Sequence, residues 1–485
     1  MSDKVSNDVI FSNVVWKFSE KIGTQFISFC ISTIIARIVE AEEYGTVAII
    51  NAIIAVLSVF VDSGLGSALI QKKDADETDF STVFFTNIVF CLLIYTLLFI
   101  SAPYIAVFFH MSRITPYIRV LGFTIIISAL KNIQHIYISK NLIFKKFFFA
   151  SLGGTIGAGI IGIWMAVNGY GIWALIFSTL FDNLIDTIII WYSIKWRPMM
   201  VFSFDSLKEL FGFGSQLLLA DLINKTYEQI SQIFIGRFYS PEDLAYYDKG
   251  DNLSSKVTSN IDNSINSVMF PVLAKSQDDK EEVKKVMRKM LQTSFYIMTP
   301  LLIGLASVAD TAVDILLTKK WAPIIPYLRI MCIVRIFKPI HTVNLSTIQA
   351  LGRSDIFLKS ETIKKILGIT ILLISCRYGV MAIALSQLVT SFGSQLINSY
   401  PNKKLVGYSY LQQILDVMPV LILGSIMGIT VYCISFLIKN SYICLVVQIL
   451  LGMIIYIGGS ILLKFDAFYY LLDKFKKISK KMLMR

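Results

Sequence analysis

Residues 414–438 read ILDVMPVLILGSIMGITVYCISFLI, and residues 442–463, after a break of three residues, read YICLVVQILLGMIIYIGGSILL. Asp416 is the only charged residue in these two stretches. Each stretch is long enough to cross the hydrocarbon core of a bilayer as a helix, which takes about 20 residues. The pair therefore predicts a helical hairpin inside a membrane.

Apolar stretches of this kind recur along the whole chain. It has 485 residues, of which 55% are hydrophobic and 16% charged, and its mean hydropathy is +0.66, whereas soluble domains are about 25% charged. This composition predicts an all-α integral membrane protein and argues against a soluble enzyme. We place fourteen spans near residues 14–36, 46–70, 81–105, 117–139, 147–167, 171–193, 211–236, 244–270, 291–317, 325–349, 357–376, 379–399, 414–438 and 442–463.

The sequence contains no strong motif for a metal or a cofactor. Its six cysteines form no CxxC pair and its three histidines form no HExxH motif. Residues 157–162 fit GxGxxG, but they lie inside an apolar span without the strand that precedes a dinucleotide site. Gly153 and Gly157 instead form a GxxxG pair, which is typical of closely packed membrane helices. We expect no cofactor, no metal and no nucleic-acid partner.

The distribution of basic residues predicts how the spans are oriented. The two tails and the even-numbered loops contain 28 Lys and Arg, whereas the odd-numbered loops contain 7. Because basic residues stay on the cytoplasmic side, both termini are expected there. In the tail 464–485, apolar residues recur at helical spacing opposite lysines, which predicts a basic amphipathic helix on anionic inner-leaflet lipids. A frayed, solvated tail is the alternative.

The chain repeats itself after about 200 residues. Three matches carry this repeat: Ala36-Arg37 before Glu42-Glu43 with Gly236-Arg237 before Glu242-Asp243, Pro116–Arg119 with Pro326–Arg329, and Tyr170-Gly171-Ile172 with Tyr378-Gly379-Val380. The copies lie six spans apart, an even number, so they share one orientation in the membrane. We predict two parallel six-helix lobes, 1–200 and 201–409, around a central cavity, with two further helices in 410–463.

Charged and amide side chains inside spans are costly in lipid, so we expect them to face this cavity. They fall on single helical faces of spans one, six and seven, with one further acid in span two. The residues are Lys17, Glu20, Lys21 and Gln25, then Asp62, then Asp182 and Asp186, then Asp221, Asn224, Lys225 and Glu228. Hydrogen-bonded packing between helices is the alternative.

Span ten contains three cations and no acid. Arg329, Arg335 and Lys338 lie within it, and Pro339 follows, which can kink the helix. Unpaired guanidinium and ammonium groups in a water-filled cavity suit a phosphate-bearing ligand. The alternative is that these cations pair with acids of other helices.

Several short motifs resemble one membrane-protein family. The carrying residues are Trp16–Gln25, Ala36-Arg37, Glu42–Gly45, Asp62–Gly66, Ile70–Lys73, Asp79–Thr82, Phe270-Pro271, Lys320-Trp321 and Leu351–Arg353. With them the chain resembles the polysaccharide flippases of the multidrug/oligosaccharidyl-lipid/polysaccharide (MOP) superfamily, of the Wzx-type exporters of O-antigen, colanic acid and teichuronic acid. At Glu40-Ala41-Glu42 it lacks the proline usual before the acidic pair.

This resemblance implies a transporter and not an enzyme. The implied cargo is an undecaprenyl-pyrophosphate-linked oligosaccharide, flipped by alternating access across the bacterial cytoplasmic membrane. Glu20, Asp62, Asp182 and Asp186 are then candidates for coupling to H⁺ or Na⁺. We expect a monomer that works with a polysaccharide polymerase. A multidrug or organic-cation antiporter of the same fold is the main alternative, and a membrane glycosyltransferase or polymerase a weaker one, because no loop is long enough for a catalytic domain.

Overall fold

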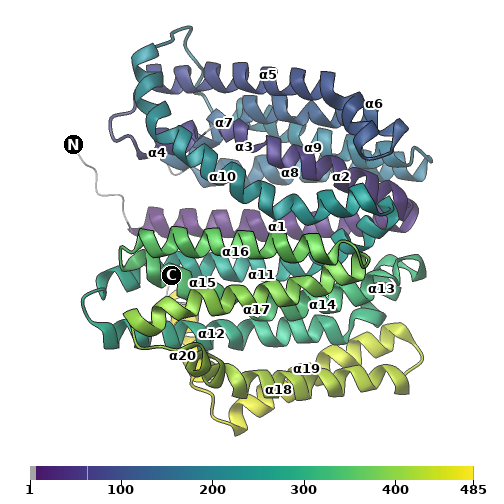
Figure 1. Ribbon diagram of the computed structural model, residues 1–485, viewed down its shortest axis with the longest axis vertical. Helices are drawn as coiled ribbons and strands as arrows, with labels where there is room; N and C mark the ends of the chain where they lie inside the picture. The colour runs from purple at the N-terminus through teal and green to yellow at the C-terminus, as the bar shows by residue number, and fades with distance from the viewer. Residues whose placement is uncertain (1–6, 63, 142, 484–485) are drawn as a thin grey trace. The chain divides into compact units, whose positions relative to one another are not determined.

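The computed structural model describes residues 7–62, 64–141 and 143–483, which are helical and contain no strand. The chain forms two compact units, Met1–Ala245 and Tyr246–Arg485, whose helices are drawn in Figure 1. Unit 1 contains α1 (Asn7–Ile38), α2 (Ala41–Leu57), α3 (Val59–Asp62), α4 (Leu65–Gln71), α5 (Glu77–Phe108), α6 (Thr115–Gly122), α7 (Thr124–Asn141), α8 (Phe144–Val167), α9 (Ile172–Ser193) and α10 (Phe204–Phe238).

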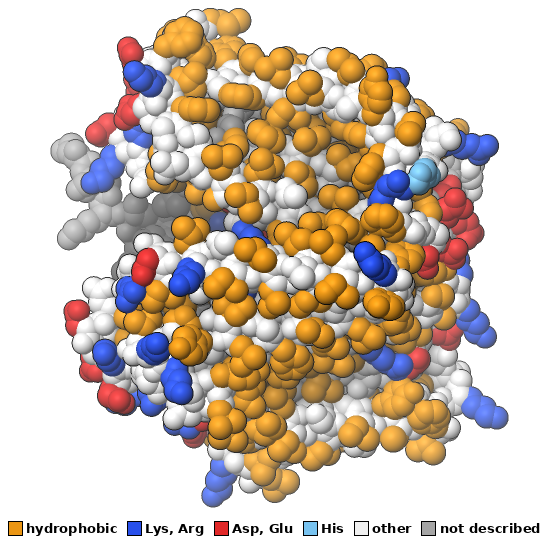
Figure 2. Space-filling view, viewed as in Figure 1, with side chains coloured by type: hydrophobic (Ala, Val, Ile, Leu, Met, Phe, Trp, Pro, Cys, Tyr) orange, Lys and Arg blue, Asp and Glu red, His pale blue; other side chains and the backbone are white. Residues whose placement is uncertain are grey.

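Unit 2 contains the remaining helices. They are α11 (Pro241–Lys275), whose first turn belongs to unit 1, α12 (Lys280–Ser307), α13 (Ala309–Leu317), α14 (Ile324–Ile336), α15 (Lys338–Ala350), α16 (Ser354–Ser375), α17 (Val380–Leu405), α18 (Tyr410–Leu437), α19 (Ser441–Leu462) and α20 (Asp466–Leu483). Figure 2 shows hydrophobic side chains over the middle of α16, α17 and α18, with charged side chains toward the helix ends. This is the surface of a multi-pass membrane protein.

Each predicted span coincides with one helix or with successive short helices. Ten segments in the described part of the chain are long and apolar enough to cross a membrane. Four segments are not apolar enough to meet this criterion: α10, α11, α14–α15 and α16. All of them carry charged side chains within the predicted spans. The all-helical membrane class is therefore confirmed, while the number fourteen stays a prediction.

Four predicted spans, the second, fourth, ninth and tenth, are divided between successive helices, and the divisions of spans ten and two have a clear physical cause. Span ten is divided into α14 and α15, and Pro339 occupies the first turn of α15, where its missing N–H costs no hydrogen bond. Span two is divided into α2, α3 and α4, and Gly64 precedes α4 with a φ of 67°. A Cβ at Gly64 would lie 2.0 Å from the carbonyl oxygen of Gly214 in α10. Only glycine therefore permits this approach of two backbones.

Glycines also let α8 and α9 pack closely. A Cβ on Gly154 would lie 2.8 Å from the carbonyl oxygen of Asp182, and one on Gly157 would lie 2.4 Å from Ile185 Cδ1. The stretch that fits GxGxxG is thus part of a helix-packing surface, as its GxxxG spacing predicts.

The anchors of the sequence repeat contact one another in unit 1. The N–H of Ile172 donates to Glu43 Oε1 at 3.0 Å, so the carboxylate of the Glu42-Glu43 motif caps the first turn of α9. Gly45 packs against the start of α11, because a Cβ there would lie 1.6 Å from the carbonyl oxygen of Pro241. These motif residues fix how helices meet.

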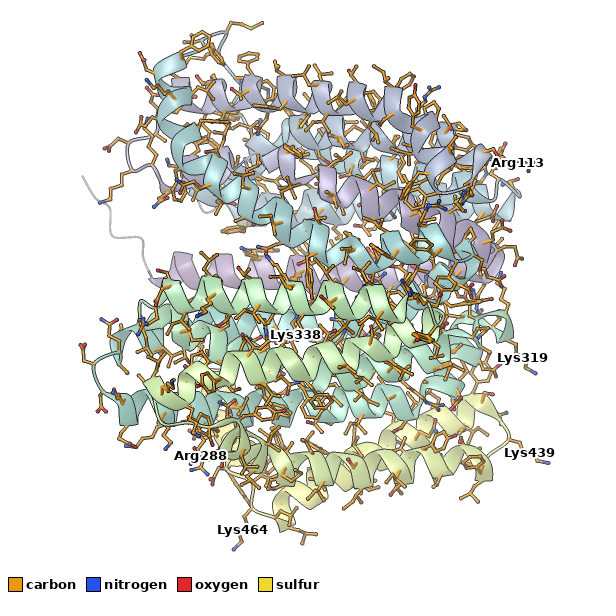
Figure 3. The ribbon with its side chains drawn as sticks, viewed as in Figure 1. Arg113, Arg288, Lys319, Lys338, Lys439 and Lys464 are labelled. Carbon is orange, nitrogen blue, oxygen red and sulfur yellow. The ribbon has the colours of Figure 1, made fainter. Side chains whose placement is uncertain are left out.

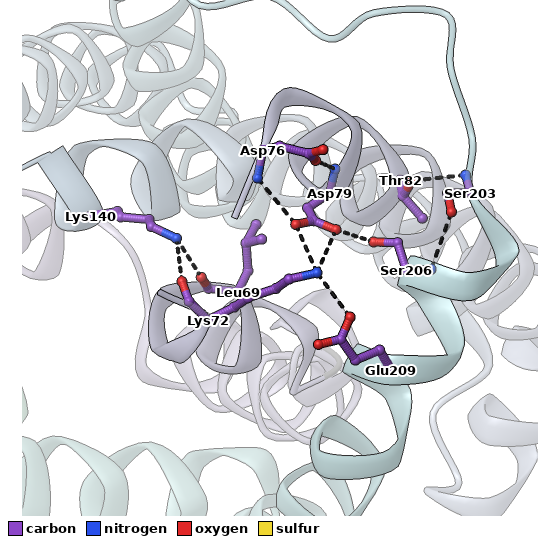
Figure 4. Close-up of polar contacts among 9 residues, drawn as sticks. All are labelled: Leu69, Lys72, Asp76, Asp79, Thr82, Lys140, Ser203, Ser206 and Glu209. Atoms are coloured by element: carbon purple, nitrogen blue, oxygen red, sulfur yellow. Dashed lines mark hydrogen bonds and ion pairs between the residues drawn. The ribbon is translucent and has the colours of Figure 1, made fainter. Parts of the chain in front are cut away.

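A polar cluster fastens the start of α10 to α4 and α5 (Figure 4). Lys72 Nζ lies 3.0 Å from Asp79 Oδ2 and 2.9 Å from Glu209 Oε2, and the Ser206 hydroxyl donates to Asp79. Asp79 also accepts from the Asp76 N–H at 3.1 Å in a capping box. The hydrogen bonds to Glu209 and Asp79 raise the pKa of Lys72, which therefore stays charged at cellular pH.

The compact units do not divide where the sequence repeat does. The repeat places the boundary at 200/201, whereas α10 packs on α2, α4 and α5 and belongs to unit 1, which ends at Ala245. The polar cluster and the Gly64–Gly214 approach explain this packing. The first helix of the second repeat is therefore held by the compact unit that contains the first repeat.

In unit 2, amide side chains join α15, α17 and α18. Asn344 Nδ2 donates to Gln413 Oε1 at 2.7 Å, and Asn402 Nδ2 donates to Asn344 Oδ1 at 2.8 Å. All three residues are at most 1% exposed. Because an unsatisfied amide is costly inside a membrane protein, this cluster sets the register of the three helices.

Candidate functional site

A group of charged residues lies inside unit 1, where α1, α7, α8 and α9 meet. Lys131 Nζ lies 3.0 Å from Asp186 Oδ2 and donates to Asn183 Oδ1 at 3.2 Å. The Ser151 hydroxyl donates to Glu20 Oε1 at 3.0 Å. The structure therefore gives Glu20 and Asp186 polar partners on neighbouring helices.

Asp182 lies one turn before Asp186 on α9, so two acids surround Lys131, while Glu20 also interacts with Lys17 and Lys21. The side chains of Lys131 and Asp186 are only 16% and 10% exposed. Asp186 Oδ1 is buried without a hydrogen-bond partner in the described part of the chain. The two acids around the single Lys131 and the open acceptor of Asp186 suit a small cation or a proton.

Sequence reasoning missed Lys131. It is the one Lys or Arg in the apolar stretch from Val120 to Ser139, and this isolated charge was the available signal. The acids of α9 were found because they repeat at i, i+4, whereas a lone lysine on α7 forms no pattern.

The other candidates of unit 1 are more exposed and do not form one cluster. Lys17 Nζ lies 5.1 Å above the ring of Phe144, and Lys225 Nζ pairs with Glu228 at 2.8 Å. α1 packs chiefly on α8, whereas α10 packs on α2, α4 and α5. The remaining candidates of these two helices are half-buried Lys21 and Gln25 and exposed Asp221 and Asn224; the side chain of Asp62 lies outside the described residues.

In unit 2, each cation of span ten lies against an acid from another helix. Arg335 donates to Asp251 Oδ1 at 2.5 Å and to the Ser254 hydroxyl at 2.9 Å. Lys338 Nζ lies 2.7 Å from Asp262 Oδ2, an ion pair without hydrogen-bond alignment. Arg329 is paired with Asp310 and donates to the carbonyl of Ala306 at 3.1 Å.

These cations are therefore not free in this structure, because each one pairs with an acid of another helix, which is the alternative to an open anion site. Two of the three partners, Asp251 and Asp262, lie on α11, three turns apart. Each pair is close to neutral, and a phosphate would have to replace a carboxylate at the guanidinium or ammonium group. Arg335 is the best placed for such an exchange, because its planar fork can bind either group through two hydrogen bonds.

Charged residues of unit 2 also mark the two ends of its helices (Figure 3). Arg288, at the start of α12, and Lys464, after α19, lie at one end, on the left of the view; Lys319 and Lys439 lie at the other, on the right. Even-numbered loops and the C-terminal tail therefore lie at one end and odd-numbered loops at the other, as the predicted spans require. The side of the membrane that each end faces stays a prediction.

Comparison with known proteins agrees with this architecture. The protein family described as "Polysaccharide biosynthesis protein" matches residues 34–326. The chain is 29% identical over 301 residues to the teichuronic acid biosynthesis protein TuaB of Bacillus subtilis, with coverage of 61% of this chain and 62% of that protein. It is 24% identical to the lipopolysaccharide biosynthesis protein WzxC of Escherichia coli (82% and 83%) and 22% identical to the succinoglycan biosynthesis transport protein ExoT of Rhizobium meliloti (69% and 67%).

Solved structures share the fold at low sequence identity. The lipid II flippase MurJ in an inward closed conformation superposes with a TM-score of 0.75 at 16% identity, over 94% of this chain and 99% of that one. An inward-facing MATE multidrug transporter of the MOP superfamily superposes with a TM-score of 0.63 at 15% identity, over 79% and 95%. The helical architecture and the family match lead to one conclusion: this chain belongs to the polysaccharide biosynthesis protein family, within the MOP fold.

Proposed function

We propose that the protein flips an undecaprenyl-pyrophosphate-linked oligosaccharide from the cytoplasmic to the outer leaflet, by alternating access, during polysaccharide export. The family match carries this proposal, since relatives include a protein named for succinoglycan transport. The fold of the lipid II flippase covers 94% of the chain, whereas the MATE transporter covers 79%. Relatives named for teichuronic acid biosynthesis, lipopolysaccharide biosynthesis and succinoglycan transport favour a flippase over a drug antiporter or an enzyme.

The cations of unit 2 are our candidates for binding the pyrophosphate. A cargo anion would compete with Asp251 for Arg335 and with Asp262 for Lys338. Such an exchange binds the cargo without leaving a bare cation inside the membrane when the cargo departs. Arg329 in unit 2, and Lys17, Lys21 and Lys225 in unit 1, are secondary candidates.

The acids of unit 1 are our candidates for coupling transport to an ion gradient. Asp186 Oδ1 is buried and unpartnered in the described part, and Asp182 and Glu20 are nearby. Binding of H⁺ or Na⁺ would reduce the excess negative charge around Lys131 and so change how α7 and α9 pack. We propose that the transport pathway is lined by further polar side chains of unit 1, which are Gln25, Asp62, Asp221, Asn224 and Glu228.

The protein is proposed to be a monomer in the cytoplasmic membrane with both termini in the cytoplasm. The helix α20 forms over Asp466–Leu483 as an amphipathic helix, and Lys289 lies 4.0 Å from the ring of Tyr470 within it. Its exposed lysines Lys474 and Lys476 suit anionic inner-leaflet lipids. A polysaccharide polymerase would act on the flipped product.

The test compares Arg335→Gln with the pair variant Arg335→Gln/Asp251→Asn. The assay is surface polysaccharide in cells that lack their own flippase, with the protein level in the membrane measured beside it. The single change leaves Asp251 without its partner, so loss of export could reflect folding. The pair variant removes both charges and restores a neutral contact.

If Arg335 binds cargo, the pair variant reaches a normal protein level and still fails to export. Normal export by the pair variant would show that Arg335 is structural. Resistance to cationic dyes is measured in the same cells. Loss of dye resistance in Asp182→Asn or Asp186→Asn, with polysaccharide export intact, would replace the flippase with a drug antiporter.

A further inference from the structure

A pocket of about 670 Å³ lies between the beginning of α16 and the end of α17, within unit 2. Its α16 wall repeats at helical spacing, with Ile356, then Lys359 and Ser360, then Ile363. Its α17 wall runs from Leu396 to Leu405. Seven residues of helix rise about 10 Å, so the pocket reaches about that far from the helix ends along the bilayer normal.

Positive charge gathers at the mouth of this pocket. Lys359 and Lys404 line it and are exposed, and Lys404 Nζ lies 5.2 Å from the ring of Tyr400. Arg353 also lines it but is held by Asp355 through two hydrogen bonds of 2.8 and 2.9 Å. This contact lowers the pKa of Asp355 to about 2, so both side chains stay ionised and their opposite charges cancel. Two lysines therefore remain without an acidic partner among the described residues.

Below the lysines the pocket becomes apolar and faces outward. Ile363 is 44% exposed and Leu396 53% exposed, side chains that suit contact with lipid. Between them Ser360 is only 5% exposed and lines the pocket. The pocket thus offers cations first, then one buried hydroxyl, then apolar walls.

This arrangement, with cations at the mouth and apolar side chains deeper in the bilayer, matches the headgroup and acyl chains of a phospholipid in one leaflet. Figure 2 shows Lys and Arg side chains around hydrophobic ones over the left ends of α16 and α17. A free phosphate would gain nothing from the apolar walls, and a soluble organic anion would have to leave water for a lipid-facing groove. Basic pockets between membrane helices bind anionic headgroups for this reason.

We propose that the pocket between α16 and α17 binds an anionic phospholipid, with its headgroup phosphate at Lys359 and Lys404 and part of one acyl chain against Ile363 and Leu396. The site lies on lipid-facing helices, apart from the paired cations of α14 and α15. It supplies a lipid requirement that is independent of the cargo.

The experiment uses the full chain in vesicles that contain dibrominated lipids, which quench nearby tryptophan. Leu396→Trp adds a probe in the pocket, and Leu373→Trp adds a matched probe on α16 that is 50% exposed and does not line the pocket. Fluorescence of the unsubstituted protein is subtracted. Quenching by brominated phosphatidylglycerol is compared with quenching by brominated phosphatidylcholine.

At the Leu396 probe we expect phosphatidylglycerol to bind roughly 25-fold more tightly than phosphatidylcholine, since each of the two lysines contributes about fivefold near a surface. At the Leu373 probe we expect no preference. Lys359→Gln/Lys404→Gln should lower the pocket's preference to about twofold or less, and Lys359→Arg/Lys404→Arg should keep it. The control Lys280→Gln/Lys403→Gln removes two exposed lysines that do not line the pocket and should leave the preference unchanged.

Equal quenching by both lipids at Leu396, or an equal loss in the control variant, would overturn the proposal. Undecaprenyl phosphate that displaces phosphatidylglycerol at equimolar concentration would also overturn it, because the site would then serve the cargo. Gel filtration establishes that each variant is folded, and Ile363→Trp replaces the probe if Leu396→Trp is not. None of these outcomes depends on export, so the proposed function is tested separately.

Discussion

Asp79→Ala should destabilise the protein far more than Glu209→Ala, although both carboxylates bind the same lysine. The difference follows from burial. The Asp79 side chain is 5% exposed, and it accepts from Lys72, from the Ser206 hydroxyl and from the Asp76 N–H. The Glu209 side chain is 64% exposed, and Lys72 is its one partner among the described residues.

The expected magnitudes differ accordingly. Loss of the capping contact costs about 1 kcal/mol. Loss of the hydrogen bonds to Lys72 and Ser206 costs about 1.5–3 kcal/mol for each bond that involves a charge, less than additively. We therefore expect about 3–5 kcal/mol for Asp79→Ala, against about 0–1 kcal/mol for an exposed pair such as Lys72–Glu209.

The measurement is thermal unfolding of the purified protein in detergent. Unit 1 spans Met1–Ala245, and in a domain of that size 1 kcal/mol changes the melting temperature by about 2–4 °C. Asp79→Ala should lower it by roughly 10 °C and Glu209→Ala by about 2 °C or less. Equal decreases, or a stable Asp79→Ala protein, would refute the view that the buried carboxylate organises this cluster.

Three further predictions concern orientation, packing and the charged group of unit 1. A cysteine at Asn168 should react in intact cells with an impermeant thiol reagent, whereas a cysteine at Lys280 should react only after the membrane is opened; the reverse pattern would invert the topology. Gly154→Leu should reduce the amount of folded protein, because a larger side chain forces α8 and α9 apart and costs their packing contacts. Gly212→Leu, where a Cβ would meet nothing within 4 Å, should leave the amount of folded protein unchanged. Lys131→Met should destabilise by about 3–5 kcal/mol because it strands a buried carboxylate, and changing that partner to asparagine as well should recover most of the loss; unfolding in detergent measures both, and no recovery would refute the pairing.

Hydropathy and periodicity were enough to predict the helices of this fold. Each apolar stretch of about 20 residues became one helix or successive helices because lipid leaves few other ways to satisfy the backbone. The break before Pro339 followed from the chemistry of proline. The division of span two could not be read in this way, because Gly64 acts through its contact with Gly214, about 150 residues later in the chain.

The candidate residues were found more easily than their partners. Spacing identified the cations of span ten and the acids of α9, but it could not show that Arg335 meets Asp251, since those residues lie on helices far apart in sequence. Lys131 had no repeated neighbour and was missed. Motif residues such as Glu43 and Asp79 signalled the family, while their roles as a helix cap and as the centre of a polar cluster needed coordinates.

The packing of α10 has a consequence for biogenesis. Lys72, Asp79 and Gly64 leave the ribosome before Glu209 and Gly214, so these partners of the first half of α10 have already been inserted when that helix arrives. A nascent chain that ends shortly after Ala245 therefore holds a complete compact unit. Translocation machinery can release this half into the bilayer while the other half is still being translated. This order limits the number of inserted helices whose polar side chains have not yet met their partners.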